Sequence, residues 1–203
     1  MKRVTCLLIC LIMCWIIPAT ADVSAEKALP RGKSLGIIKT EWIDRYNAIP
    51  TKIVGQKTEV FLMLLTEEDC RKYYFANPLD NVDFTVMCED NTDEVVAVFI
   101  QIHLKELSDS YDLGNTVGRF ISESVYRMAL ATDQNTTIQS IADTVFPALD
   151  VNAIQANQDF NNSVNLNGFI YVFTLSEDGL MYGVKNSTVF ESEEEFQTYR
   201  NSK

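Results

Sequence analysis

Histidine and basic residues are scarce in this sequence. It contains one histidine, His103, and 17 lysines and arginines against 28 aspartates and glutamates. A single histidine leaves one candidate base for Ser-His-Asp catalysis and few nitrogen ligands for a zinc site. The acidic excess disfavours binding to nucleic acid and to anionic lipid head groups, because both repel a negatively charged protein. We therefore expect neither as a partner.

Motifs with a known chemical mechanism are also missing. The chain has no G-x-S-x-G pattern for a nucleophile elbow and no G-x-G-x-x-G or G-x-x-x-x-G-K pattern for binding phosphate. The sequence therefore indicates no catalytic residue, no metal ligands and no cofactor, and it favours a protein that is not an enzyme.

One long apolar run is present, and it lies at the N-terminus. Residues 4–17 are almost entirely apolar, follow Lys2 and Arg3, and are ended by Pro18 and a small-residue stretch up to Ala21. This order is typical of a cleaved secretory signal peptide, and the run is shorter than the roughly 20 residues of a spanning helix. We predict cleavage after Ala21, a secreted or periplasmic location, and no stable membrane insertion of the mature chain.

Export would leave a strongly acidic protein. Lys2 and Arg3 would be removed with the signal, which carries no acid, so the formal net charge would change from −11 to −13. Such a charge favours solubility and neutral or cationic partners.

Only two of the five cysteines, Cys70 and Cys88, lie outside the predicted signal. Lipidation of a signal cysteine would require a small residue before it, whereas large residues precede Cys10 and Cys14. Two cysteines in an oxidising compartment usually pair. A zinc site would need more ligands, and a thiol nucleophile would need a neighbouring base.

The spacing of two predicted strands supports a Cys70–Cys88 disulfide. Residues 70–76 and 82–88 are rich in strand-forming residues and flank the turn sequence N-P-L-D-N. In a hairpin centred on Leu79, Cys70 faces Cys88. Directly opposed Cβ atoms lie about 4.5–5.5 Å apart, and a disulfide needs about 3.8 Å. A small adjustment would close the bond, so we predict a structural disulfide.

The order of elements predicts an α+β fold. A short helix begins at the cap Thr40 and ends at Pro50, and a capping box at Thr136 precedes the last helix of a helix hairpin. The predicted strands cover residues 59–65, 70–76, 82–88, 95–104, 169–175 and 180–185. The two further predicted helices cover 114–131 and 138–149. We expect residues 151–167 to form a surface loop and the acidic tail from 191 to form an exposed helix or a frayed end. Strands followed by helices favour an antiparallel sheet, here a meander plus a C-terminal hairpin, covered by the helix hairpin and the short N-terminal helix. We expect a flexible lead-in at 22–36 and a single domain at 37–203.

Two apolar runs differ in what they predict. Residues 95–104 are apolar on both faces up to Gln101, which indicates a central strand covered on both sides, with His103 partly buried at its rim. Residues 60–65 form a six-residue apolar run that suits a buried strand.

Three consecutive aromatic residues, Tyr73, Tyr74 and Phe75, form the candidate binding surface. Successive strand residues point to opposite faces, so each face would display a ring, and the less buried face could bind protein or carbohydrate. Alternatively, the outer ring packs under a loop. Residues 89–94 are a candidate for a weak calcium site, because they are rich in oxygen ligands, although they lack the glycine and terminal glutamate of an EF-hand.

These observations favour an exported, non-catalytic protein that binds another protein or an envelope component. One alternative is a hydrolase that uses two carboxylates, with candidates in 67–69 and 89–94. The other is a small-ligand carrier with an apolar cavity between helices and sheet.

Overall fold

The computed structural model describes residues 31–50, 59–68, 70–103 and 118–203. The chain divides into two compact units, one formed by 34–187 and the other by 1–33 with 188–203. The predicted signal peptide, 1–21, lies outside the described residues, as does 22–30 of the predicted lead-in. The single domain at 37–203 stays a prediction. Within the described residues, no helix is long and apolar enough to cross a bilayer.

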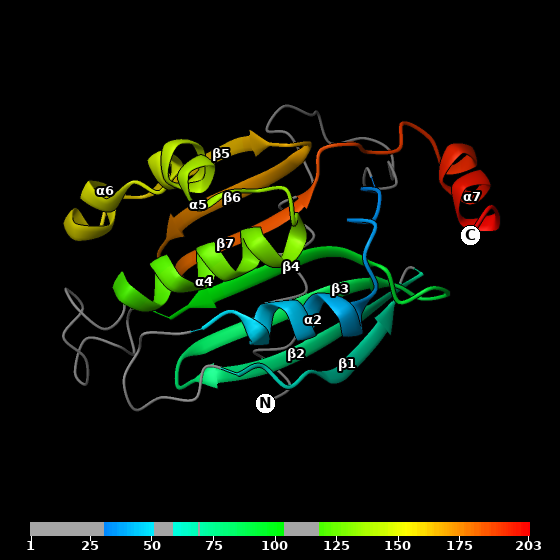
Figure 1. The fold of residues 1–203 in the computed structure, drawn as a ribbon, viewed down its shortest axis with the longest axis horizontal. Coiled ribbons are helices and arrows are strands. Elements are labelled where there is room, and N and C mark those ends of the chain that lie inside the picture. The colour runs from blue at the N-terminus through cyan, green and yellow to red at the C-terminus, as the bar shows by residue number, and fades with distance from the viewer. Residues whose placement is uncertain (1–30, 51–58, 69, 104–117) are drawn as a thin grey trace. The chain divides into compact units, whose positions relative to one another are not determined.

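The larger unit is built on one seven-stranded antiparallel sheet, which confirms the α+β class (Figure 1). Across the sheet the strands follow the order β1-β2-β3-β4-β7-β6-β5. Their bounds are β1 Met63–Glu68, β2 Arg71–Leu79, β3 Val82–Glu89, β4 Val95–Ile102, β5 Phe160–Leu166, β6 Phe169–Ser176 and β7 Gly179–Asn186.

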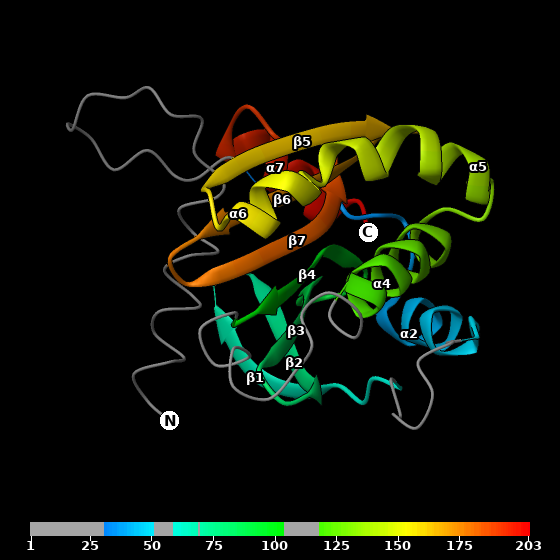
Figure 2. The same ribbon diagram turned by 90° about the vertical axis from the view of Figure 1, so that its left-hand side faces the viewer.

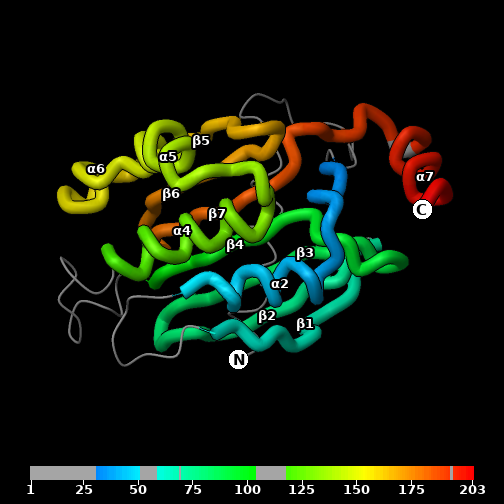
Figure 3. Tube along the Cα trace, in the orientation of Figure 1, coloured from blue at the N-terminus to red at the C-terminus, as the bar shows by residue number. Residues whose placement is uncertain are grey.

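The chain fills this sheet from its two edges inward (Figure 3). The first four strands form the predicted meander and end at β4 in the middle. After the helices, the chain enters at the far edge as β5 and returns through β6 to β7, which pairs with β4. The first strand, β1, is therefore left at one edge and β5 at the other.

The helices of the larger unit differ in length and type. They are α2 Lys39–Ala48, α4 Gly118–Thr132, α5 Ile138–Ser140, a π-turn η2 Ile141–Val145, a 3-10 turn η3 Phe146–Ala148 and α6 Val151–Ala156. Figure 2 shows α2 and α4 side by side on one face of the sheet. Covering that face buries the apolar stripe of each helix.

Aromatic packing joins these two helices to the sheet. Trp42 stacks on Tyr46 in α2 with ring centroids 5.3 Å apart, and the Tyr46 ring meets the edge of Phe84 in β3 at 5.2 Å. The indole nitrogen of Trp42 donates a hydrogen bond of 3.1 Å to the hydroxyl of Thr132 at the end of α4. The buried indole thus keeps its polar atom satisfied while it links both helices.

The central strand β4 is buried at every position, as the sequence predicts. On the face away from α2, the Phe99 ring lies over Gly183 of β7, and a Cβ at Gly183 would come within 2.5 Å of that ring. A glycine is required there because any side chain would displace Phe99.

Several predicted boundaries were wrong. The first helix begins at Lys39 and has no side-chain cap, so Thr40 is not its N-cap. The capping box is real but lies one residue later, between Thr137 and Ser140. The expected surface loop at 151–167 contains α6 and β5. The polar residues of β5 alternate outward from an edge strand, which gave the sequence the composition of a loop.

The smaller unit joins residues 31–33 to the C-terminal helix α7, Glu193–Asn201. The Ser192 side chain caps α7 by accepting a hydrogen bond from the amide of Glu195. Phe190 packs against Phe196 at 5.4 Å, and the guanidinium of Arg31 lies 4.4 Å from the centre of the Phe196 ring. The acidic tail therefore folds as a helix anchored by aromatic contacts.

Replacing Thr132 with valine tests the link between α2 and α4. Thr132→Val keeps the shape but leaves the Trp42 indole nitrogen without an acceptor in a buried site. We expect the free energy of unfolding, measured by urea denaturation, to fall by about 1–3 kcal/mol. Ser122→Ala removes a hydroxyl from the exposed side of α4 and should change it by less than about 0.5 kcal/mol. Equal effects in both variants would contradict the role of this bond.

Asp133 ties the end of α4 to the β5–β6 turn. Its carboxylate accepts hydrogen bonds from the Asn135 amide, the Thr136 hydroxyl and the Asn167 side chain, at 2.9, 2.8 and 2.7 Å. Burial opposes ionisation of Asp133, but these hydrogen bonds outweigh it and lower its pKa.

A lowered pKa in the folded state predicts a defined pH dependence. Asp133→Ala should lower the free energy of unfolding by about 1–2 kcal/mol at pH 7. Because the folded pKa is lower than the unfolded one, the difference from wild type should persist above about pH 4 and shrink as the pH falls through the folded pKa. Urea denaturation between pH 7 and 2 measures this, and a constant difference would refute it.

Candidate functional site

The predicted aromatic surface is mostly buried. Tyr73 and Tyr74 point to opposite faces of β2, and both are buried, while Phe75 is half-buried. The Tyr74 ring lies beneath α2, where the Lys39 ammonium sits 3.4 Å from its centre, and its hydroxyl donates to Asp93 at 3.3 Å. Tyr73 and Tyr74 therefore offer little ring area to a partner, and they serve packing.

The predicted register of the β2–β3 hairpin was wrong by two residues. Lys72, not Cys70, lies opposite Cys88, and Cys70 lies outside β2 in the preceding turn with a φ of 61°. The turn sits at Asp80–Asn81 rather than at Leu79, because Asn81 adopts a positive φ and the pairing is irregular between Ala76 and Leu79.

The two cysteines are consequently free thiols, and the predicted disulfide is not formed. Cys88 is buried and Cys70 is half-exposed. Residues that are diagonal neighbours across a strand pair are about 7–8 Å apart, which is too far for a disulfide without backbone movement.

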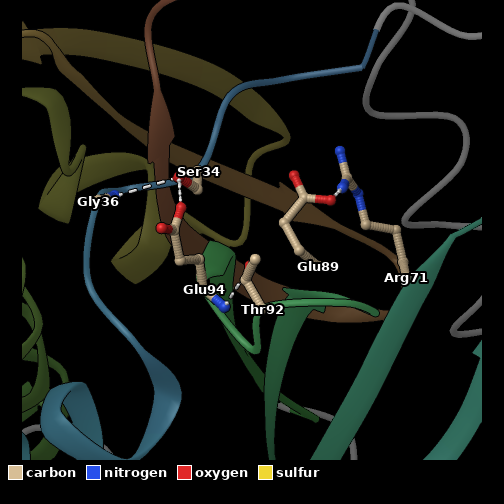
Figure 4. A network of polar contacts seen from close by, with 6 residues as sticks. All are labelled: Ser34, Gly36, Arg71, Glu89, Thr92 and Glu94. Atoms are coloured by element: carbon tan, nitrogen blue, oxygen red, sulfur yellow. Dashed lines mark hydrogen bonds and ion pairs between the residues drawn. The ribbon is translucent and has the colours of Figure 1, made fainter. Parts of the chain in front are cut away.

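The acidic segment 89–94 is engaged in protein contacts (Figure 4). Glu89 forms a buried ion pair with Arg71 across β2 and β3, and Glu94 accepts a hydrogen bond of 2.5 Å from Ser34. Asp93 pairs with the Lys72 ammonium at 3.0 Å. Among the described residues, no group of three or more acidic, histidine or cysteine side chains is placed to hold a metal ion.

The direction of its pKa shift also argues against Asp93 as a general acid. Burial raises the pKa of Asp93, but the hydrogen bond and charge of Lys72, with smaller contributions from Lys39 and Tyr74, lower it overall. A general acid in a hydrolase needs the opposite shift.

His103 lies at the rim of the sheet, as predicted, and is half-buried. Its Nε2 is 3.0 Å from one Asp83 oxygen, and the Asn77 side chain donates to the other at 2.8 Å. Such an Asp–His pair orients an imidazole but defines no reaction by itself.

The interface between α4 and β7 is occupied by packed side chains. Val125 and Met128 of α4 and Tyr182 of β7 belong to one buried cluster. The Ser124 and Tyr182 hydroxyls lie 2.5 Å apart within it. The carrier hypothesis, which needs an apolar cavity between helices and sheet, stays a prediction.

The edge strand β1 presents the most unusual surface among the described residues. Phe61, Met63, Leu64 and Leu65 are 74%, 68%, 52% and 40% exposed, although the sequence run predicted a buried strand. Among the described residues, β1 pairs only with β2, and its other side forms an edge of the sheet. Open edges with exposed apolar residues are ready to pair with another strand.

The position of this segment is fixed by the residue before it. The Asn47 side chain of α2 donates to the Val60 carbonyl and accepts from the Val60 amide, both at 2.9 Å. Val60 itself is buried beneath α2. These two hydrogen bonds fix one end of the exposed segment. Its apolar side chains therefore extend from an anchored backbone.

The opposite edge of the sheet is built differently. The exposed positions of β5 are Asn161, Ser163 and Asn165, and the strand lies against η2. Polar side chains at an edge discourage pairing with other chains. Because of this contrast, we take residues 61–65 as the candidate site. They comprise the first three residues of β1 and the two residues before it, and are hereafter called the β1 edge.

The sequence did not predict this site, because a short apolar run has the same residue pattern in a buried strand and in an exposed one. One signal was present: Glu59 precedes the run and Glu67 and Glu68 follow it. Charges that flank an apolar run are common at edges that must avoid aggregation.

The chain matches no family model, no curated protein and no solved structure with which it was compared. Function is therefore argued from the chemistry of the site alone.

The two thiols should differ sharply in reactivity. Burial raises the pKa of Cys88 to about 12, so that little reactive thiolate forms at neutral pH. We expect iodoacetamide at pH 8 to modify Cys70 in the folded protein and Cys88 only after unfolding. Mass spectrometry of the alkylated peptides measures this; rapid modification of Cys88 in the folded state, or resistance of both to alkylation, would contradict the structure.

Proposed function

We propose that this chain is an exported, non-catalytic binding protein that engages an extended segment of a partner protein along the β1 edge. The observation that supports the proposal is the open, apolar edge of β1. In this mode the partner adds a strand to the sheet, so that main-chain hydrogen bonds give affinity and alternate side chains give specificity.

The apolar side chains favour binding over an unused edge. Met63 lies opposite Phe75 on one face of the sheet and Leu64 opposite Tyr74 on the other, so an added strand would cover apolar groups on both faces. Full burial of one such side chain contributes about 1.5–3 kcal/mol. The β2 and β3 strands behind the edge are held by the buried Arg71–Glu89 pair, so the surface is organised before binding.

Export is the second part of the proposal. It is supported by the charged, apolar and small-residue order of residues 1–21. A partner would then be another exported protein or a protein component of the cell envelope.

Serine substitution of the exposed apolar residues tests binding at this edge. The double variant Phe61→Ser, Met63→Ser should keep the stability of the wild type within about 0.5 kcal/mol per site, because both side chains are exposed. Its affinity for a synthetic peptide of alternating valine and threonine should fall at least about tenfold, measured by fluorescence anisotropy.

Two controls sharpen this experiment. Ile138→Ser removes a 64% exposed apolar side chain far from β1 in the sequence and should not alter binding. A peptide with N-methylated alternate amides, which cannot form the strand ladder, should not bind. Unchanged affinity of the Phe61, Met63 variant would refute the site.

A further inference from the structure

We infer that the partner segment has apolar residues at alternate positions and lysine or arginine at its ends. This inference rests on the proposed function and names the kind of partner that the β1 edge fits.

Within residues 59–68 the charged side chains are all acidic. Glu59, Glu67 and Glu68 are exposed, and residues 59–68 contain no basic residue. An incoming strand therefore meets apolar side chains in the middle and carboxylates at both ends.

The two basic residues that lie opposite Glu67 and Glu68 pair with other acids. Lys72 lies opposite Glu67 but pairs with Asp93, and Arg71 lies opposite Glu68 but pairs with Glu89. The charges of Glu67 and Glu68 thus remain in excess at this end of the strand, where a cation from a partner would be attracted.

The same charges disfavour a second copy of this chain. An antiparallel copy centred on Leu64 would bring Glu59 of each chain beside Glu68 of the other. Like charges in cross-strand contact are destabilising, and the net charge of −11 on each chain adds repulsion. The acids therefore discriminate against self-association and favour a cationic strand.

Three synthetic peptides with the same valine–threonine core test the inference. One has two lysines at each end, one has two glutamines and one has two glutamates. At low salt the lysine peptide should bind about tenfold more tightly than the glutamine peptide, the gain expected from about two exposed ion pairs, and the glutamate peptide should bind most weakly. The preference should shrink at about 0.5 M salt because exposed charges are then screened.

Charge-matched variants test whether Glu67 and Glu68 cause the preference for the lysine peptide. Glu67→Gln with Glu68→Gln should remove most of the preference for the lysine peptide over the glutamine peptide. Glu177→Gln with Asp178→Asn changes the net charge equally in the exposed β6–β7 turn and should preserve the preference. Equal losses in both variants would mean attraction by overall charge and would overturn the inference.

The remaining outcomes separate this inference from the proposed function. Equal binding of all three peptides, lost in the Phe61, Met63 variant, would overturn the partner class while the site stands. Failure of every peptide to bind would overturn both. A dimer in solution that dissociates on Phe61→Ser, measured by light scattering, would assign the edge to a second copy and overturn the inference.

Discussion

The pairing of β4 with β7 is the constraint on which the rest of the larger unit depends. Val98 lies opposite Val184 and Ile100 opposite Tyr182, so the seam joins a four-stranded meander to three later strands. The joined sheet is wide enough for α2 and α4 to lie side by side on one face and bury Trp42 and Tyr46. Because both halves meet in the middle, the strands farthest from the seam, β1 and β5, become the edges.

Among the described residues, both edge strands have backbone groups on one side that could pair with another chain, and the two differ in the side chains they expose. β5 exposes polar residues at alternate positions, whereas the β1 edge exposes phenylalanine, methionine and leucine side chains between acidic residues. A protein that had only to avoid aggregation would gain from polar residues at both edges. The exposure of apolar side chains at the β1 edge, next to a backbone position held by Asn47, is the physical reason to propose it as a binding surface.

Much of the fold could be predicted from the sequence, because period and turn chemistry are local. The strands of the meander, the helix over 118–132 and the β6–β7 hairpin lie within a few residues of their predicted bounds. Register could not be predicted as well: the irregular pairing near Pro78 moved Cys88 opposite Lys72 and removed the disulfide. The site was missed for a related reason, since whether Phe61 and Leu64 are covered depends on which strand ends at the edge, and that is decided by the distant β4–β7 pairing.

The central proposal is that the β1 edge binds an added strand. Hydrogen–deuterium exchange of the protein, with and without the lysine-flanked peptide, tests this most directly because it reports on the main-chain amides themselves. We expect peptide binding to slow exchange within residues 61–68 and to leave the amides of β5 unchanged. Slowed exchange in β5 alone, or no change in 61–68 at saturating peptide, would contradict it.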